Sequence, residues 1–514
     1  MDLNNPDGIA NLKEFSSQLA QNLLEDKDNP IILVPGFSGW GTPLFGSINY
    51  WGRIENIPKL LMDKGYSVIE RACELYRQLT IGRLSVFDPA TQEIEEQHDV
   101  DINYGNYFTL DPANSPTTLI TQGRKRAILY SQSPERFIQW VWSKENPAHF
   151  ICHSQGGNTV RYLISLMTQG SGGQHPEYFS EVKRGNWVIS VTTLGTPHKG
   201  TTITDVIENF MLGSRDQLIK LLARLFATFS FNNPAQRSYD LQLDHWGICR
   251  QGNETFQEMR QRLESIPGPV SKWYNSQNNA FYDNSIKGVN MLHMKASPLS
   301  EDTYYFSLAF HSTVPFPSTW PPWTVEAAEG VLHSIPVVNI GAWVVDRILD
   351  AIGHIVGWAI ILPLLNVRDV VRWVTRDVLN RLLRDTNYQV QLPLPGKYLP
   401  RKDVIPLMVP TVYAMGGQDL MSEQIDTLGP DLGDWYLNNG IVNTNSMRGP
   451  DDSIVRDIAA FPISDVNSYG ARGLYWHFGT NSVMDHADEI GIFIKENTVC
   501  SLFYAKQKRQ NPAG

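Results

Sequence analysis

A serine between small residues, where a short apolar run meets a helical pattern, is the first feature of this sequence that could do chemistry. The run 149–152 leads into CHSQG (152–156), and apolar residues then recur at helical spacing as far as Met167. The form small-x-Ser-x-Gly is typical of a nucleophile elbow, a tight turn between strand and helix that points the serine hydroxyl outward. The sequence therefore predicts Ser154 as the nucleophile of a reaction through an acyl-enzyme.

Two backbone amides and one histidine are candidates to assist this serine. The helix after Ser154 begins with free N–H groups, so the amide of Gln155 is one candidate donor to an oxyanion. The second donor is expected on the loop after an earlier strand, where Phe37 follows the apolar run 31–34. His486 is the candidate base, because it ends a polar loop late in the chain and a catalytic imidazole needs such a loop to reach the serine.

Strands that alternate with helices must position these residues. Apolar and β-branched runs predict buried strands at 31–34, 149–152, 187–194, 303–310 and 410–416, and helical patterns predict helices at 203–230 and 255–264. Such alternation predicts the α/β fold class, with a mainly parallel central sheet and helices on both faces.

Composition and charge limit the kind of partner. The chain has 514 residues and a net charge of −10, which disfavours a nucleic-acid-binding surface. Its four cysteines show no metal-binding spacing and are expected to be reduced thiols. Because the first twenty residues contain neither a basic start nor an apolar run, we expect no signal peptide and a cytoplasmic location, with membrane association left open.

The region 316–408 differs from the rest of the chain. Its longest stretch without a charged residue, 351–367, is too short to span a bilayer, which needs ~20 apolar residues. The following 368–385 has an apolar face and a face rich in arginine. It is interpreted either as a solvated outer helix or as part of a peripheral membrane contact over 337–385.

Several motifs in the same order resemble the triacylglycerol lipases of the bacillar and staphylococcal type. They are GFSGWG (36–41), ERACELYRQL (70–79), HSQGG (153–157), SVTTLGTPHKGTT (190–202), LDHWG (243–247), GIVNT (440–444) and the loop around Asp485 and His486. The resemblance implies an α/β-hydrolase with a helical lid, expected near 203–235, that hydrolyses carboxylic esters of long acyl chains. It places the family's nucleophile on Ser154, its histidine on His486 and its oxyanion donors on Phe37 and Gln155.

The acid of the family departs from this pattern. It is an Asp immediately before GIVNT, where this chain has Asn439. An Asn can fix the histidine tautomer only in part and gives the imidazolium no charge, and the corresponding change in serine proteases lowers turnover ~10⁴-fold. Two alternatives stay open: either Asn439 orients His486 alone, or a carboxylate has migrated, with Asp451, Asp452 or Asp434 as candidates.

The resemblance also implies a zinc site with two carboxylates and two histidines. Glu70 and Asp244 occupy the carboxylate positions, but His98 is the only histidine where two should lie. We therefore expect no zinc, and expect Glu70 and Asp244 to be structural, paired with Arg71 or Arg250.

The resemblance also bears on calcium binding and on two further histidines. Asp488 matches one calcium ligand of the family, but Phe493 stands where another carboxylate belongs, so too few oxygen ligands remain. We expect neither a metal nor another cofactor. His153 and His198 are interpreted as structural histidines.

The predicted organisation is one catalytic domain with an insertion. Its parts are an N-terminal extension (1–30), the first part of the core (31–315), the apolar and amphipathic insertion (316–408), the second part of the core (409–498) and a tail (499–514). The predicted function is a serine hydrolase acting on small-molecule esters or lipids, a lipase or carboxylesterase. A lipase-like acyltransferase and a catalytically weak protein that binds lipid or membrane are the alternatives, and the oligomeric state is not predicted.

Overall fold

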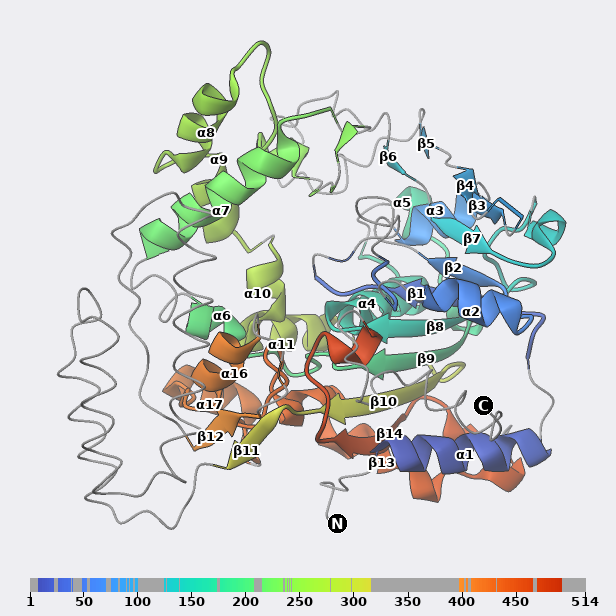
Figure 1. Ribbon diagram of the computed structural model, residues 1–514. Helices are drawn as coiled ribbons and strands as arrows, with labels where there is room; N and C mark the ends of the chain where they lie inside the picture. The colour runs from blue at the N-terminus through green and yellow to red at the C-terminus, as the bar shows by residue number, and fades with distance from the viewer. Residues whose placement is uncertain are drawn as a thin grey trace, which may run out of the picture.

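A single mainly parallel sheet forms the centre of the molecule. The computed structural model describes residues 8–99, 124–315 and 397–491, apart from short gaps such as 40–48, 71–74 and 208–214. In these residues, ten strands form one sheet in the order β13-β14-β10-β9-β8-β1-β2-β7-β3-β4 (Figure 1). Neighbouring strands run parallel except for the pairs β2–β7 and β3–β4. The predicted α/β fold class is confirmed.

The strands of this sheet are β1 (Ile31–Val34), β2 (Val68–Glu70), β3 (Ser85–Asp88), β4 (Glu93–Glu95), β7 (Ile128–Tyr130), β8 (Ala148–His153), β9 (Val188–Leu194), β10 (Tyr304–Phe310), β13 (Val455–Asp457) and β14 (Tyr475–Asn481). Two separate pairs are β5 (His98–Asp99) with β6 (Arg124–Lys125), and β11 (Thr313–Pro315) with β12 (Tyr398–Pro400). The strands predicted at 31–34, 149–152, 187–194 and 303–310 are therefore confirmed to within a residue or two at each end.

The register of the central strands brings two loops together. β1 lies beside β8, and Val34 pairs with Cys152 at the carboxyl ends of both strands. The loop that follows β1 and the turn that follows β8 therefore leave the sheet at the same edge, where ligands of open α/β sheets bind.

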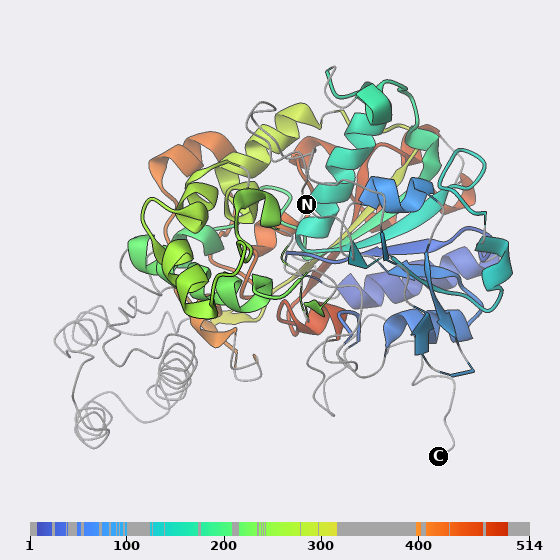
Figure 2. The same cartoon turned by 90° about the horizontal axis from the view of Figure 1, so that it is seen from above.

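Helices cover both faces of the sheet (Figures 1 and 2). The described helices are α1 (Gly8–Asn22), α2 (Ile57–Asp63), α3 (Leu75–Ile81), α4 (Gln155–Gln169), α5 (Pro176–Phe179), α6 (Ile203–Val206), α7 (Arg215–Ser230), α8 (Phe256–Glu264), α9 (Pro269–Asn275), α10 (Ala280–Asn284), α11 (Ile286–Lys295), α16 (Val409–Met415) and α17 (Ser422–Leu428). One buried apolar cluster joins the sheet to α1 and α2, and a second joins it to α3 and α4. The helix predicted at 255–264 is confirmed as α8, and the one predicted at 203–230 comprises α6 and α7, with 208–214 outside the described residues.

The strand predicted at 410–416 is wrong, because this segment forms helix α16. A proline lies in its first turn, where a helix needs no amide donor. Val412 and Met415, three residues apart, pack with Ile203 and Val206 of α6 in one buried cluster. The β-branched residues that favoured a strand are thus buried against a helix instead.

Helices α7, α8 and α9 form an apolar cluster of their own, set beside the sheet (Figure 2). Phe226 of α7 packs edge-on against Trp273 of α9, with ring centroids 5.2 Å apart. The lid predicted near 203–235 falls partly on this cluster, and its role as a lid stays a prediction.

The ends of the predicted insertion meet in the pair β11–β12. Pro315 pairs with Tyr398 in an antiparallel register, although 82 residue positions separate them in the sequence. Residues 316–396 lie outside the described residues, as do the predicted membrane contact at 337–385 and the tail at 499–514. No described helix is both long enough and apolar enough to cross a bilayer.

Candidate active site

Ser154 lies in a strained turn between β8 and α4. Its φ of 53° and ψ of −132° are unusual for a residue with a side chain, and such strain is concentrated at functional sites. A Cβ on Gly156 would lie 2.7 Å from the carbonyl oxygens of Val34 and Pro35. The glycine is therefore required where α4 passes the end of β1, and the predicted elbow geometry is present.

The loop after β1 packs directly against the nucleophile. A Cβ on Gly36 would lie 2.5 Å from the Cβ of Ser154 and 3.1 Å from its Oγ. Phe37 follows Gly36, and its half-exposed ring lies 6.0 Å from that of Phe281 in α10. Gln155 is the first residue of α4. The two predicted oxyanion donors thus come from the two segments adjacent to Ser154.

His486 lies in the loop after β14, and its ring is close to that of His153. The ring centroids of the two histidines are 4.4 Å apart, and the amide of His486 donates to the carbonyl of Asn439 at 2.9 Å. Asp485 Oδ1 then accepts the amides of Ala487 and Asp488 at 3.0 and 3.1 Å. These bonds turn the chain back on itself immediately after the histidine.

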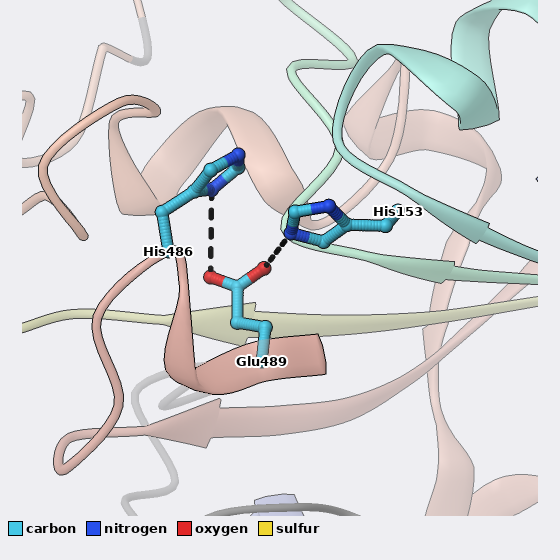
Figure 3. A group of neighbouring side chains, drawn as sticks. All are labelled: His153, His486 and Glu489. Carbon is cyan, nitrogen blue, oxygen red and sulfur yellow. Dashed lines mark hydrogen bonds and ion pairs between the residues drawn. The ribbon is translucent and has the colours of Figure 1, made fainter. Parts of the chain in front are cut away.

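This turn places a buried carboxylate, Glu489, between the two histidines (Figure 3). Its Oε2 is 3.1 Å from His153 Nε2, and its Oε1 is 3.8 Å from His486 Nδ1. Glu489 belongs to none of the motifs that predicted the site. Two features of the sequence could have indicated it. Asn439 left the acid position without a carboxylate, and Glu489 lies three residues after His486, a spacing that puts two side chains on the same face of a helical turn.

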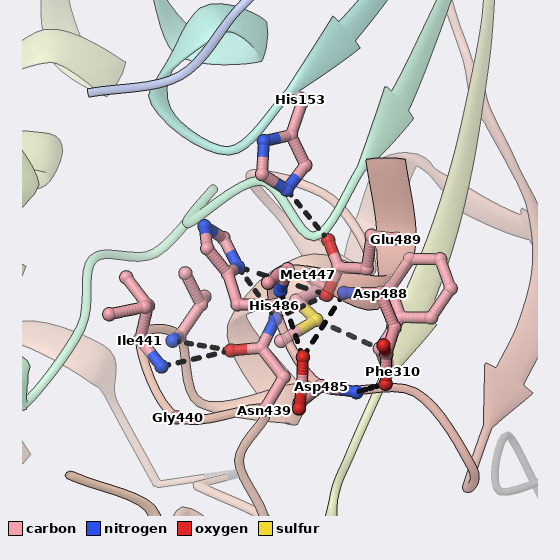
Figure 4. A network of polar contacts seen from close by, with 12 residues as sticks. His153, Phe310, Asn439, Gly440, Ile441, Met447, Asp485, His486, Asp488 and Glu489 are labelled. Carbon is pink, nitrogen blue, oxygen red and sulfur yellow. Dashed lines mark hydrogen bonds and ion pairs between the residues drawn. The ribbon is translucent and has the colours of Figure 1, made fainter. Parts of the chain in front are cut away.

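Asn439, at the acid position of the family, also reaches His486 (Figure 4). Its Nδ2 lies 2.9 Å from His486 Nδ1 and also donates to Glu489 Oε1. Its Oδ1 accepts the amides of Ile441 and Val442 at 3.1 and 2.8 Å. These two amides fix the orientation of the carboxamide, with its NH₂ group toward the histidine.

The three alternative carboxylates have other partners. Asp452 is 2.7 Å from Lys199 Nζ, and Asp451 accepts the amide of Ser453 at 2.8 Å. Asp434 accepts the hydroxyl of Tyr398 at 2.6 Å. Among the described ion pairs of His486, the carboxylate partner is Glu489.

A chain of hydrogen bonds assigns the proton of His153. The Glu489 carboxylate can only accept, so His153 carries its proton on Nε2 and donates it to Glu489. Nδ1 of the neutral ring then accepts from the Tyr50 hydroxyl at 2.6 Å, and that hydroxyl accepts the amide of Gly36 at 2.9 Å. Burial and the nearby His486 lower the pKa of His153 to about 4, so His153 is neutral at pH 7. Burial alone would raise the pKa of Glu489, but His486 nearby and the bond from His153 hold it below its usual value.

His198 is buried away from solvent, with Nε2 3.1 Å from Thr193 Oγ1 and its ring edge-on to Tyr475 at 4.8 Å. Burial lowers its pKa well below the usual value. These contacts support its interpretation as a structural histidine.

Of the zinc ligands implied by the resemblance, Asp244 is the one whose side chain the structure describes, and the absence of zinc stays a prediction. Asp244 forms a buried ion pair with Arg237 at 2.8 Å, so a guanidinium already compensates its charge. The expected partner Arg250 instead lies over the ring of Phe231, 4.7 Å from its centroid. Glu70 ends β2, and its side chain and Arg71 lie outside the description.

Asp488, which matches a calcium ligand of the family, has a hydrogen-bond partner within its own turn. Asp488 Oδ2 accepts the amide of Asp485 at 3.2 Å within the turn after the histidine. Phe493 lies outside the described residues. Cys152 and Cys249 are free thiols, and Cys73 and Cys500 lie outside the description.

Comparisons with known proteins find lipase-like sequences. The family described as "Lipase-like, C-terminal domain" matches residues 130–314. A lipase of Staphylococcus epidermidis is 26% identical over 355 residues, which are 61% of this chain and 45% of the relative. A lipase of Staphylococcus hyicus is 27% identical over 303 residues, 55% of this chain and 40% of the relative. The chain thus spans less than half the length of these relatives.

Solved structures support the fold. The crystal structure of Staphylococcus hyicus lipase superposes with a TM-score of 0.52 at 19% identity, covering 94% of both chains. The structure of EstA from Clostridium botulinum gives 0.51 at 19% identity, covering 96% of this chain and 95% of the other. The sheet order, the elbow after β8 and these matches define the α/β-hydrolase fold. The chain is a distant homologue of the staphylococcal lipases, at about 27% identity.

Proposed function

We propose that the protein is a serine hydrolase that cleaves carboxylic esters, with Ser154 as the nucleophile. The observation that supports this most directly is the strained elbow of Ser154, against which Gly36 packs so closely that a side chain would overlap the nucleophile. A hydroxyl held in this way, next to two amide-bearing segments, suits attack on a carbonyl carbon.

In the proposed mechanism, Ser154 Oγ attacks the ester carbonyl and its proton passes to His486 Nε2. The amides of Phe37 and Gln155 stabilise the oxyanion. The bond to the alcohol breaks as His486 returns the proton to the departing oxygen, which leaves an acyl group on Ser154. A water molecule then repeats the two proton transfers, releases the acid and restores the serine.

A lipid-like ester is the proposed substrate class. The family relationship supports it, since the relatives are named lipases. The Phe37 ring also supports it, because it is 52% exposed beside the nucleophile and presents apolar surface to an acyl chain.

Labelling with a fluorophosphonate tests the nucleophile, and a series of p-nitrophenyl esters from short to long acyl chains tests the substrate class. We expect the wild-type protein to be labelled and to hydrolyse the esters. Ser154→Ala should abolish labelling and lower kcat by at least about 10³-fold.

Ser165→Ala is the matched control, because Ser165 lies in the same helix and donates to the carbonyl of Lys295. It should keep labelling and hydrolysis. Equal activity of wild type and Ser154→Ala would exclude this function. An acceptor alcohol added to the same assay measures acyl transfer against hydrolysis.

A further inference from the structure

We propose that Glu489 has replaced the missing acid of the family, as the carboxylate that orients His486 and stabilises its imidazolium. This inference depends on the proposed function, in which His486 is the base. Glu489 would act through His486 rather than on the substrate, so it is a positioning residue. Its place three residues after the histidine gives the chain order serine, histidine, glutamate.

Asn439 alone gives His486 the wrong proton arrangement. Because its Oδ1 is held by the amides of Ile441 and Val442, its Nδ2 faces His486 Nδ1 at 2.9 Å. An N–H donor there favours the tautomer with the imidazole proton on Nε2. Nε2 is the nitrogen that has to accept the proton of Ser154, so the amide opposes catalysis and repels the imidazolium.

Glu489 supplies the charge that Asn439 lacks. Its carboxylate is completely buried, and its Oε1 lies 3.8 Å from His486 Nδ1. A negative charge at this distance in a water-excluded site favours a proton on Nδ1 and stabilises a positive ring. The distance is longer than a hydrogen bond, and such contacts in sites without substrate often shorten in the reacting complex.

The other contacts of Glu489 leave its charge available to His486. Oε2 accepts from His153, whose ring burial keeps neutral and whose second nitrogen accepts from the Tyr50 hydroxyl. Oε1 accepts from the neutral amide of Asn439. Both partners hold the carboxylate in place with neutral donors, so neither cancels the charge.

The backbone of a neighbouring strand end makes room for this carboxylate. Gly195 has a φ of 56°, and a Cβ on it would lie 2.8 Å from Cδ and 2.9 Å from Oε1 of Glu489. Gly195 directly follows β9, which pairs with the nucleophile strand β8. The position of Glu489 is therefore defined by the central sheet as well as by its own turn.

The decisive experiment removes the carboxylate from position 489 and then introduces one at position 439. Glu489→Gln keeps the shape and removes the charge, and we expect kcat to fall by about 10²- to 10⁴-fold with little change in KM. Adding Asn439→Asp returns a carboxylate to the family's position, and the double variant should regain at least about tenfold in kcat. A purely structural role of Glu489 would not be rescued by Asn439→Asp.

Glu423→Gln is the control, since Glu423 is exposed on α17 and pairs with Lys287 at 3.0 Å. It should leave kcat unchanged. The proposal is overturned if Glu489→Gln keeps more than about a third of the wild-type kcat, or if the folded double variant shows no recovery.

A readout without substrate separates this proposal from the proposed function. At a pH where His486 is neutral, ¹⁵N chemical shifts of its ring should place the proton on Nδ1 in the wild type and on Nε2 in Glu489→Gln. An unchanged tautomer would overturn the proposal even in an active enzyme. A changed tautomer in a protein that no fluorophosphonate labels would support the pairing and exclude the hydrolase.

A bound metal is the competing explanation for the same side chains. Ligand atoms of His153, His486 and Glu489 lie within 4.8 Å of one another. If the group positions the base, EDTA should leave hydrolysis unchanged. Loss of activity in EDTA with recovery on adding Zn²⁺ would assign the group to a metal and overturn the proposal.

Discussion

Single glycines determine the shape of the candidate site, because backbone segments approach one another where a side chain would not fit. Gly36 is the clearest case, since it separates the end of β1 from the nucleophile. Any group added there must displace either Ser154 or the loop that bears the amide of Phe37. A displacement of one ångström is enough to misalign an oxyanion donor.

Gly36→Ala is therefore expected to lower kcat by about 10²-fold, the usual effect of losing one oxyanion donor. Gly470→Ala is the control, because a Cβ there would meet nothing within 4 Å. Steady-state kinetics of both variants, with melting curves to verify folding, give the test. A normal kcat in Gly36→Ala would contradict the assignment of this loop to the oxyanion hole.

At the candidate site, the features that depend on local geometry were predictable from the sequence. The elbow around Ser154 follows from steric limits within five residues, so a short motif is sufficient to find it. Glu489 depends on a turn that doubles back after His486 and on the space above Gly195. Such a contact needs the packing of β9 against β8, which no short motif describes.

At the scale of elements, helix α1 behaves as a component of the core rather than as an appendage. Phe15 lies within 6 Å, ring centroid to ring centroid, of Phe306, Phe461 and Phe478, at 5.9, 5.1 and 5.4 Å. Asn11 Nδ2 donates to the carbonyl of Phe478 in β14 at 2.7 Å. The helix thus covers the sheet next to the strand that leads to His486.

Phe15→Ala should lower the free energy of unfolding by about 3–5 kcal/mol, as expected for the loss of a buried aromatic ring. Ser17→Ala in the same helix should change it by less than about 0.5 kcal/mol, because Ser17 is exposed. Urea unfolding of both variants measures the difference. Equal stability would show that α1 is not docked on β14.

Strands could be predicted from apolar runs where these runs lie next to one another in the sheet, as β1, β8, β9 and β10 do. The segment 410–416 shows the limit of this reasoning. Its β-branched residues are equally suited to a buried helix face, and contact with α6 determined the outcome. Tertiary packing of this sort overrides intrinsic strand preference.

At the scale of the whole molecule, buried neutral histidines link folding to pH. Burial lowers the pKa of His153 to about 4, of His477 to about 3, and of His198 well below the usual 6.5. In the unfolded chain these rings take up protons below pH 6.5, so the unfolded state binds more protons and stability falls on acidification. Asp283 acts in the opposite sense between pH 4 and 6, because burial raises its pKa to about 6.

The three histidines outnumber Asp283, so near pH 5 the unfolded state binds more protons than the folded state. We expect the free energy of unfolding to fall as the pH is lowered from 6 to 5. Asp283→Asn removes the opposing group and should make the fall steeper. Chemical denaturation at several pH values measures both slopes, and a flat profile would contradict this account.

The pairing of Pro315 with Tyr398 fixes the two points at which the chain leaves the core and returns to it. These two points lie on adjacent, hydrogen-bonded strands, so the pair β11–β12 itself holds the ends of the intervening segment together. A sequence of almost any length can therefore be accommodated there without shifting the register of the central sheet. A change in the length of that stretch would therefore leave the strands on either side in place.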